Sequence, residues 1–131
     1  MLSIFLSTSS KKRIVSKHFS YLIDQGYRLS YELILNVIDQ FRFSHVNGNY
    51  VNVEYDFREN YVNIEVVKDE KKLLHLDYEN IHYSMDLHNV QDMLAAVEKV
   101  YTHYKSLRRY RVYRFFEEVI SIYATYLKSY F

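Results

Sequence analysis

The sequence contains no cysteine, no proline and no tryptophan, and only two glycines, Gly26 and Gly48, among its 131 residues. Without cysteine the chain cannot form a disulfide, a cysteine-ligated zinc site or a thiol nucleophile. Two isolated glycines cannot make the glycine-rich loop that cradles phosphates in many nucleotide-binding proteins. A Gly-x-Ser-x-Gly elbow and a His-Glu-x-x-His motif are also missing. We therefore expect a protein that is not an enzyme and has no cofactor.

Long apolar runs are missing as well. No segment reaches the roughly 20 consecutive apolar residues that a membrane-spanning helix needs. The opening segment Met1–Leu6 is apolar but short, and no positive region precedes it, so we expect a short strand or a first helical turn rather than a signal peptide. A cysteine-free chain suits a reducing compartment, and we expect a cytoplasmic protein without a membrane partner.

The composition is that of a folded protein. Hydrophobic residues make up 49% of the chain and charged residues 25%, and the length predicts a single domain over 1–131. Aromatic residues are abundant, with 15 Tyr and 8 Phe. Tyr rings suit both the edge of a core and a binding surface, and the sequence leaves both roles open.

The formal net charge of +1 conceals an uneven distribution. Segment 1–28 carries five Lys or Arg and one acid, segment 29–98 carries five and thirteen, and segment 99–131 carries seven and two. The chain is therefore basic at both ends and acidic in the middle. These charges either neutralise one another in the fold or form separate faces that select partners by charge.

A helix is expected near the start of the chain. Ser9 or Ser10 is a natural N-cap, and Gly26 provides the left-handed position that often ends a helix. Between them, three- and four-residue spacing defines one apolar face, made of Ile14, Val15, His18, Phe19, Leu22 and Ile23.

The middle of the chain alternates between apolar and polar residues, which indicates half-buried strands. The expected strands are Phe41–His45, Tyr50–Phe57, Tyr61–Val67 and Leu73–Leu76. Asn47–Gly48 is a strong hairpin turn between the first two. Residues 27–40 fit either a strand over Tyr27–Leu35 or a helical continuation, and we expect a mixed segment there.

Two further helices are expected in the last third. Asp86 or Asn89 can cap the first, whose apolar stripe is Val90, Met93, Leu94, Val97, Tyr101 and Tyr104. A break is predicted near Leu107–Tyr110. The second helix has two apolar faces, one of Tyr113, Phe116, Ile120, Tyr123, Ala124 and Leu127 and one of Phe115, Val119, Ile122, Tyr126 and Tyr130. So broad an arc predicts burial against the sheet and another helix, or against a second copy in a homodimer.

The order of these elements predicts an α+β fold. We expect an antiparallel β-meander of about four strands, with an N-terminal helix and two C-terminal helices packed on one face. A helix followed by several strands and then two helices argues against a parallel, doubly wound sheet.

The hairpin over Val51–Val66 and its flanking helices resemble those of small bacterial immunity-type proteins, which neutralise toxins. In the hairpin an alternating strand ends in the acid-aromatic-Arg-acid turn Asp56–Glu59 and returns as a second strand. Phe19–Tyr27 resembles the first helix of such proteins and its Gly-aromatic exit, and Tyr123–Lys128 resembles their last helix. Residues 27–40 depart from the pattern because the link to the sheet is longer. The resemblance implies a cytosolic protein-binding inhibitor and supplies no catalytic residues.

Acidic residues on the polar side of this hairpin form the first candidate site. A four-residue loop at Arg58–Tyr61 would place Glu54 opposite Glu65, whereas a two-residue loop would place Glu54 opposite Asn63. Like charges directly across a sheet cost about 0.2–1 kcal/mol. Either Arg or Lys from a neighbouring strand relieves this cost, or the acids form a platform for a cationic partner, such as a nuclease toxin with a basic cleft. The expected contacts with the protein partner are Glu54, Asp56, Arg58, Glu59, Tyr61 and Glu65.

Basic residues near the predicted helix break form the second candidate site. They are Lys105, Arg108, Arg109, Arg111 and Arg114, interleaved with Tyr104, Tyr110 and Tyr113. Arg and Tyr together suit phosphate contacts and base stacking, so the alternative function is a nucleic-acid-binding regulator. On one continuous helix, however, the five would not form a single stripe, and Arg near a helix end can simply complement the helix dipole. Because the whole chain is not strongly basic, we do not expect nucleic acid to be the main partner.

Two further hypotheses concern the partner and a metal. A phage-encoded or mobile-element inhibitor of a host enzyme would be a small blocker of the same kind as a toxin inhibitor. A cluster that could hold a metal is His75, Asp77, Glu79, His82, Asp86 and His88. It contains one Glu-x-x-His motif, whereas carboxylate-bridged metal sites use two on facing helices, so we expect no metal site.

Overall fold

The computed structural model describes residues 6–77, 80–85 and 87–131. Contacts divide the chain into two compact units, a helical unit (Met1–Ser20 with Asp86–Phe131) and a sheet unit (Tyr21–Met85). The expectation of one domain over 1–131 stays a prediction. The expected short strand or first helical turn at Met1–Leu6 lies almost entirely outside the described residues.

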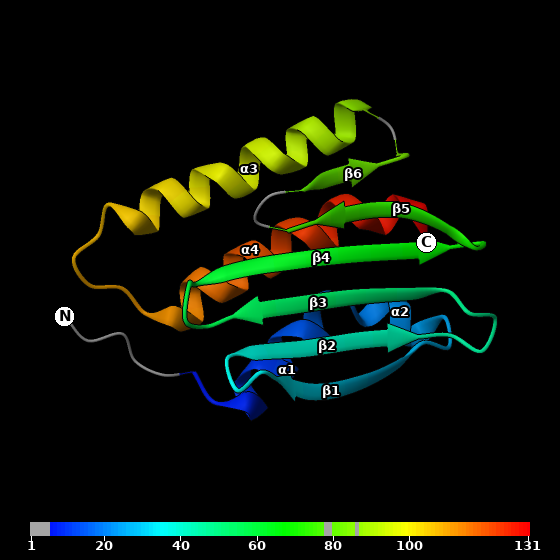
Figure 1. Cartoon of the computed structure of the whole chain (residues 1–131), viewed down its shortest axis with the longest axis horizontal. Coiled ribbons are helices and arrows are strands. Elements are labelled where there is room, and N and C mark those ends of the chain that lie inside the picture. The colour runs from blue at the N-terminus through cyan, green and yellow to red at the C-terminus, as the bar shows by residue number, and fades with distance from the viewer. Residues whose placement is uncertain (1–5, 78–79, 86) are drawn as a thin grey trace. The chain divides into compact units, whose positions relative to one another are not determined.

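The sheet unit contains six strands that are antiparallel and follow chain order (Figure 1). They are β1 (Arg28–Ile34), β2 (Ile38–Ser44), β3 (Tyr50–Asp56), β4 (Tyr61–Lys68), β5 (Lys71–Leu76) and β6 (Ile81–Tyr83). The predicted α+β class and antiparallel meander are confirmed, but the prediction of about four strands was too low. Strands β1 and β6, the two edges, are the additional ones.

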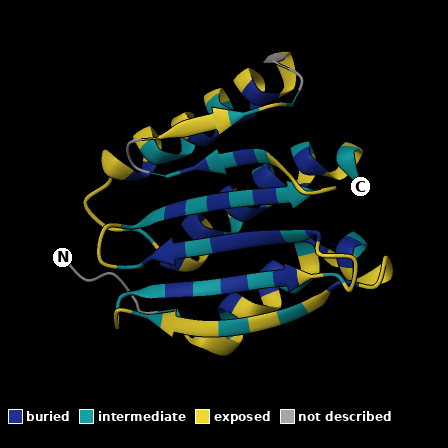
Figure 2. Ribbon diagram, turned by 45° about the vertical axis from the view of Figure 1, so that its right-hand side comes forward, coloured by how far each residue is buried: buried dark blue, intermediate teal, exposed yellow. Residues whose placement is uncertain are grey.

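Alternation along each strand gives the sheet two different faces. One face carries the buried apolar side chains, which are Phe41, Phe43, Val51, Val53, Tyr55, Val62, Ile64, Val66, Leu74 and Leu76. The opposite face carries mostly polar side chains of intermediate exposure, and Figure 2 shows the resulting banding along β2 to β5. The antiparallel register keeps like side chains in rows across the strands.

Tight turns connect the strands and account for the number of strands. Leu35 and Asn36, between β1 and β2, both have positive φ, of 53° and 60°. Asp69 and Glu70, between β4 and β5, have φ of 53° and 64°. Because two residues at positive φ are the backbone of a primed hairpin turn, residues 27–40 form a hairpin and not a helical continuation. The expected hairpin turn at Asn47–Gly48 is confirmed, with Gly48 at φ +94°.

The first predicted helix consists of two helices. Helix α1 (Thr8–His18) ends at Phe19, and α2 (Ser20–Asp24) follows at once. The N-cap of α1 is Ser7, whose side chain accepts a hydrogen bond from the backbone N–H of Ser10 at 3.1 Å, and not Ser9 or Ser10. A helix begins where a side chain can satisfy its first N–H groups, and Ser7 reaches one of them.

Gly26 ends α2 as predicted. Its φ is +93°, its N–H donates to the carbonyl of Ile23, and the N–H of Tyr27 donates to the carbonyl of Leu22. This pair of bonds is the Schellman motif, which needs a residue that tolerates the left-handed conformation.

The helical unit is organised around its last long helix. Helix α3 (Leu87–Lys105) and α4 (Val112–Leu127) are followed by a 3₁₀ turn, η1 (Lys128–Tyr130), and α4 contacts both α1 and α3. The predicted break near Leu107–Tyr110 is confirmed. Of the proposed caps for α3, Asp86 lies outside the described residues, and Asn89 lies inside the first turn and donates to the Tyr130 hydroxyl at 3.4 Å. Helix packing on one sheet face and a homodimer both stay predictions.

Within the described part of the chain, no helix is long and apolar enough to cross a membrane.

Candidate functional site

A row of polar side chains crosses the whole sheet. In the register of the six strands, one residue from each strand lines up in the order Ser30, Arg42, Asn52, Glu65, His75 and His82. Neighbouring rows on this face add Tyr50, Glu54 and Asn63. We call the part of this face on β3, β4 and β5 the polar sheet face.

Glu65 lies at the centre of the polar sheet face and has three partners. The Tyr50 hydroxyl donates to one carboxylate oxygen, the Nδ1 of His75 lies 2.7 Å from the other, and the Nζ of Lys72 lies 3.5 Å from it. Burial opposes ionisation of this carboxyl, but the hydrogen bonds from Tyr50 and His75 outweigh it and lower the pKa of Glu65. Glu65 is therefore an ionised carboxylate held in one orientation.

His75 bridges two carboxylates. Its Nε2 lies 2.9 Å from Oδ2 of Asp77, and its Nδ1 contacts Glu65. The hydrogen bonds to Asp77 and then Glu65 raise the pKa of His75 above its ordinary value. Both ring nitrogens of His75 face carboxylate oxygens, which accept hydrogen bonds, so in this arrangement neither nitrogen presents a lone pair to a metal ion or a substrate.

Glu54 lines a hollow together with Glu65, His75 and Asp77. The Nδ2 of Asn52 donates to Glu54 at 3.1 Å, and the Nε of Arg42 donates to the Oδ1 of Asn52 at 3.3 Å. The hollow measures about 180 Å³, and its lining residues are Asn52, Glu54, Asn63, Ile64, Glu65, His75, Leu76 and Asp77.

One acceptor atom of the residues that line the hollow has no hydrogen-bond donor among the described residues. This atom is the Oδ1 of Asn63, which is buried. The carboxylates of Glu54, Glu65 and Asp77 supply further acceptors around the same space. The lining therefore offers many more acceptors than donors, which suits a ligand that donates.

The register settles the two alternatives left by the sequence. Glu54 lies opposite Asn63, and Glu65 lies opposite Asn52. The register with Glu54 facing Glu65 was wrong, because Asp56 pairs with Tyr61. The observed register is that of the two-residue alternative, but the loop itself has four residues, 57–60, and begins one residue earlier than the Arg58–Tyr61 loop. No pair of acids faces directly across β3 and β4 in this register. Lys72 from β5 relieves the charge of Glu65, as one of the two readings of the sequence expects.

The structure places the six predicted contact residues in two groups. Glu54 and Glu65 lie on the polar sheet face with the hollow. Asp56 is 4% exposed, and its Oδ1 accepts from the backbone N–H groups of Arg58 (3.0 Å) and Glu59 (3.2 Å). Asp56 therefore organises the turn and is too buried to offer a contact. Arg58 and Glu59 are exposed in that turn, and the Nε of Arg58 lies 3.6 Å from the Oε1 of Glu59.

Tyr61, the sixth predicted contact, is half-buried at the start of β4. Its hydroxyl donates to the backbone carbonyl of Asp77 at 3.3 Å. This bond ties β4 to the end of β5, next to the carboxylate that holds His75. Tyr61 therefore supports the polar sheet face from its border.

The described members of the candidate metal cluster do not form a set of ligands. Within the described ranges, no group of three or more His, Asp or Glu side chains is placed to hold a metal ion. His75 is occupied by Glu65 and Asp77, while His82 lies exposed on β6 and His88 lies exposed on α3. Glu79 and Asp86 lie outside the described residues.

The second predicted site forms the connection between α3 and α4. Lys105 is the last residue of α3, Arg108, Arg109 and Arg111 lie between the helices, and Arg114 lies in the first turn of α4. All five side chains are exposed, and none forms an ion pair within the part of the chain described. We call residues 105–114 the basic connection.

No family model, curated protein or solved structure matches this chain. The resemblance to immunity-type proteins is therefore a hypothesis that no relative tests.

Several residues of the polar sheet face were not singled out from the sequence as contacts. Strand alternation already placed Asn52 and Asn63 on the same side as Glu54, and this was the available signal. The roles of His75, Asp77 and Arg42 depend on the pairing of β2 and β5 with the central hairpin. The Asn47–Gly48 turn indicated the pairing of β2 with β3, but the sequence pattern did not give the register that sets Arg42 beside Asn52 and His75 beside Glu65.

Proposed function

We propose that this chain is a protein-binding inhibitor of the immunity type, whose protein partner docks a basic surface on the polar sheet face. The observation that carries the proposal is the hollow of about 180 Å³ lined by the carboxylates of Glu54, Glu65 and Asp77. The hollow lies on the polar, half-exposed face of the sheet, opposite the face that carries the buried apolar side chains. The proposed role is non-enzymatic.

The charges of the hollow favour a cationic partner. Even with His75 protonated and Lys72 3.5 Å from Glu65, the three carboxylates leave one negative charge in excess at the hollow. Its carboxylate oxygens supply the acceptors, whereas the Oδ1 of Asn63 is itself buried. A guanidinium or ammonium group supplies both the positive charge and the donors. A toxin with a basic substrate cleft, such as a nuclease, presents such groups.

The size of the hollow also favours a contact with a protein side chain. Pockets that bind small molecules usually have volumes of about 300–1,000 Å³, and this hollow has about 180 Å³. It can accept the end of one long side chain. The hydrogen bonds among Arg42, Asn52 and Glu54 hold the lining in place before the partner arrives, which reduces the entropy cost of binding.

The test is capture of the partner by charge-reversal variants. Wild-type protein and the variants Glu54→Lys and Glu32→Lys serve as baits in cells of the source organism. Glu32 lies in the same row of the same face as Glu54, two strands away and outside the hollow, so both variants make the same change of charge. We expect wild type and Glu32→Lys to retain one stoichiometric protein that Glu54→Lys loses.

Two results would contradict this proposal. If Glu54→Lys captured the partner as well as wild type does, the partner would not dock at the hollow. If nucleic acid were recovered without any protein, the protein-inhibitor role would be wrong. A Glu65→Lys bait is unsuitable because Glu65 contacts Tyr50, Lys72 and His75, and a cation there would disturb the sheet itself.

A further inference from the structure

The basic connection concentrates positive charge in a segment without acids, and the nearest acids in the chain are Glu98 before it and Glu117 after it. From Lys99 to Phe116 there is no Asp or Glu, while the ten residues of the basic connection hold five Lys or Arg. None of the five forms an ion pair among the residues that the structure describes. Surface charges are usually interspersed with charges of opposite sign, so an uncompensated run of this density indicates an anionic partner.

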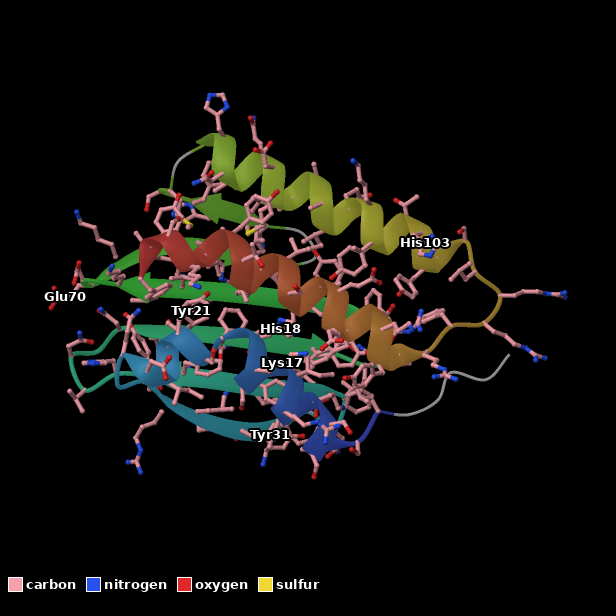
Figure 3. The ribbon with its side chains drawn as sticks, turned by 180° about the vertical axis from the view of Figure 1, so that it is seen from behind. Lys17, His18, Tyr21, Tyr31, Glu70 and His103 are labelled. Carbon is pink, nitrogen blue, oxygen red and sulfur yellow. The ribbon has the colours of Figure 1, made fainter. Side chains whose placement is uncertain are left out.

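The side chains of this segment extend into solvent. Figure 2 shows the connection between α3 and α4 as exposed. Figure 3 shows stick side chains with nitrogen ends pointing away from the ribbon along the same stretch. The segment between the helices, 106–111, is not helical, so the five cations need not share a helical stripe to act together. The objection that a continuous helix would separate them therefore does not apply.

The basic connection also places cations where a helix alone would disfavour them. Arg111 is the N-cap of α4 and makes no side-chain cap, Arg114 follows in the first turn, and that turn contains no acid. Positive side chains at this positive end of the helix dipole raise the local potential, whereas only Lys105 lies at an end where a cation is favoured. Arginines that break this local rule without forming an ion pair among the described residues are expected at functional sites.

Aromatic rings fix the connection and leave one ring available. Tyr110 packs against Tyr104, with 5.2 Å between ring centroids, and against Phe115, with 6.1 Å. These contacts hold the middle of the connection to α3 and α4. Tyr113, one position before Arg114, is 39% exposed. A ring of that exposure beside arginines can stack on a nucleobase.

We propose that the basic connection is a binding site for single-stranded nucleic acid. Arg108, Arg109 and Arg111 contact backbone phosphates, Lys105 and Arg114 extend this contact on either side, and Tyr113 stacks on a base. Arginine suits phosphate because its planar guanidinium donates two parallel hydrogen bonds. This site belongs to the helical unit and does not depend on the function proposed for the polar sheet face.

The chemistry of the segment favours nucleic acid over an anionic membrane. A segment that lies on a membrane normally presents a broad apolar face next to its cations. Among the described residues of the basic connection, the exposed large apolar or aromatic side chains are Leu107 and Tyr113, each 39% exposed. Exposed arginines beside a tyrosine ring match a phosphate backbone with unstacked bases more closely.

The test is the affinity of the full chain for a labelled oligonucleotide of about 12 nucleotides, single-stranded and of mixed sequence, followed by fluorescence anisotropy. We expect binding at about 25 mM salt that weakens steeply up to about 200 mM, with a log–log slope of up to about −3.5 if all five cations contact phosphate. The triple variant Arg108→Gln, Arg109→Gln, Arg111→Gln should lose at least about tenfold in affinity. Tyr113→Ala should bind more weakly, and Tyr113→Phe should bind like wild type.

A matched control separates the site from net charge. The variant Arg13→Gln, Arg28→Gln, Lys71→Gln removes the same number of exposed cations from outside the basic connection, and it should bind like wild type. Circular dichroism establishes that each variant is folded. The proposal is overturned if wild type does not bind at low salt, if both triple variants weaken equally, or if anionic phospholipid vesicles bind while the oligonucleotide does not. A duplex bound as tightly as the single strand, with Tyr113→Ala unaffected, would overturn the stacking contact.

Discussion

At the scale of single residues, similar carboxylates have different roles because their hydrogen-bond partners differ. Asp56 accepts from two backbone N–H groups in a turn, whereas Glu54 faces a hollow and Glu65 holds a histidine. Their spacing along one strand and its partner made them look equivalent in the sequence. The structure separates a residue that shapes the backbone from residues that remain available to a partner.

Replacing Asp56 with alanine tests this separation. Asp56→Ala leaves the N–H groups of Arg58 and Glu59 without their acceptor, so we expect a loss of about 1–2 kcal/mol in the free energy of unfolding. Glu59→Ala, in the same turn with a side chain 55% exposed, should change it by less than about 0.5 kcal/mol. Urea denaturation of both variants provides the measurement, and equal stabilities would contradict the turn-forming role.

His75 predicts a pH dependence of stability. The folded protein raises the pKa of His75 through Asp77 and Glu65. The stabilisation from the imidazolium is therefore complete below the unfolded pKa of about 6.5 and is lost as the pH rises through the higher folded value. We expect His75→Gln to destabilise the protein by roughly 1 kcal/mol more at a pH of about 5.5 than at about 9.

The measurement is urea denaturation of wild type and His75→Gln at both pH values. The control is His88→Gln, at an exposed position of α3, and its effect on the free energy of unfolding should be the same at both pH values. A cost of His75→Gln that does not depend on pH would show that the imidazolium does not bridge the two carboxylates.

At the scale of elements, the turns decided what could be predicted from the sequence. Gly26 and Asn47–Gly48 were recognised because glycine marks positive φ, and the helix break after Lys105 followed from a change of phase in the apolar stripe. Leu35–Asn36 was missed because leucine rarely adopts positive φ, and with it the hairpin of β1 and β2. Strand β6 was missed because three residues are too few to show alternation.

The turn at Leu35–Asn36 offers a stabilising substitution. Leu35 has φ of 53° and is 79% exposed, so it carries backbone strain without packing. Leu35→Asn places a residue that tolerates this conformation in the turn, and we expect the free energy of unfolding to rise by about 0.5–1 kcal/mol. Thermal or urea denaturation measures the effect. The exposed Val46→Asn is the control for removing surface apolar area, and a gain of the same size there would refute the turn argument.

At the scale of the whole molecule, the charge pattern of the sequence follows the two structural units. The sheet unit carries six Lys or Arg and eleven acids, and the helical unit carries eleven Lys or Arg and five acids. The sequence predicted opposite charges along the chain but could not assign them to units, because long-range contacts define where a unit ends. Each proposed surface lies in the unit whose charge suits its partner: the polar sheet face suits a cationic protein, and the basic connection suits a polyanion.

Titration calorimetry of the captured partner against wild type, Glu54→Lys and Glu32→Lys gives the dissociation constants that decide whether the partner docks on the polar sheet face. Reversal of a charge in a desolvated contact weakens binding far more than reversal at a solvated position of the same face. We predict at least about tenfold weaker binding for Glu54→Lys and less than about threefold for Glu32→Lys. Equal dissociation constants for the two variants would contradict docking on the polar sheet face.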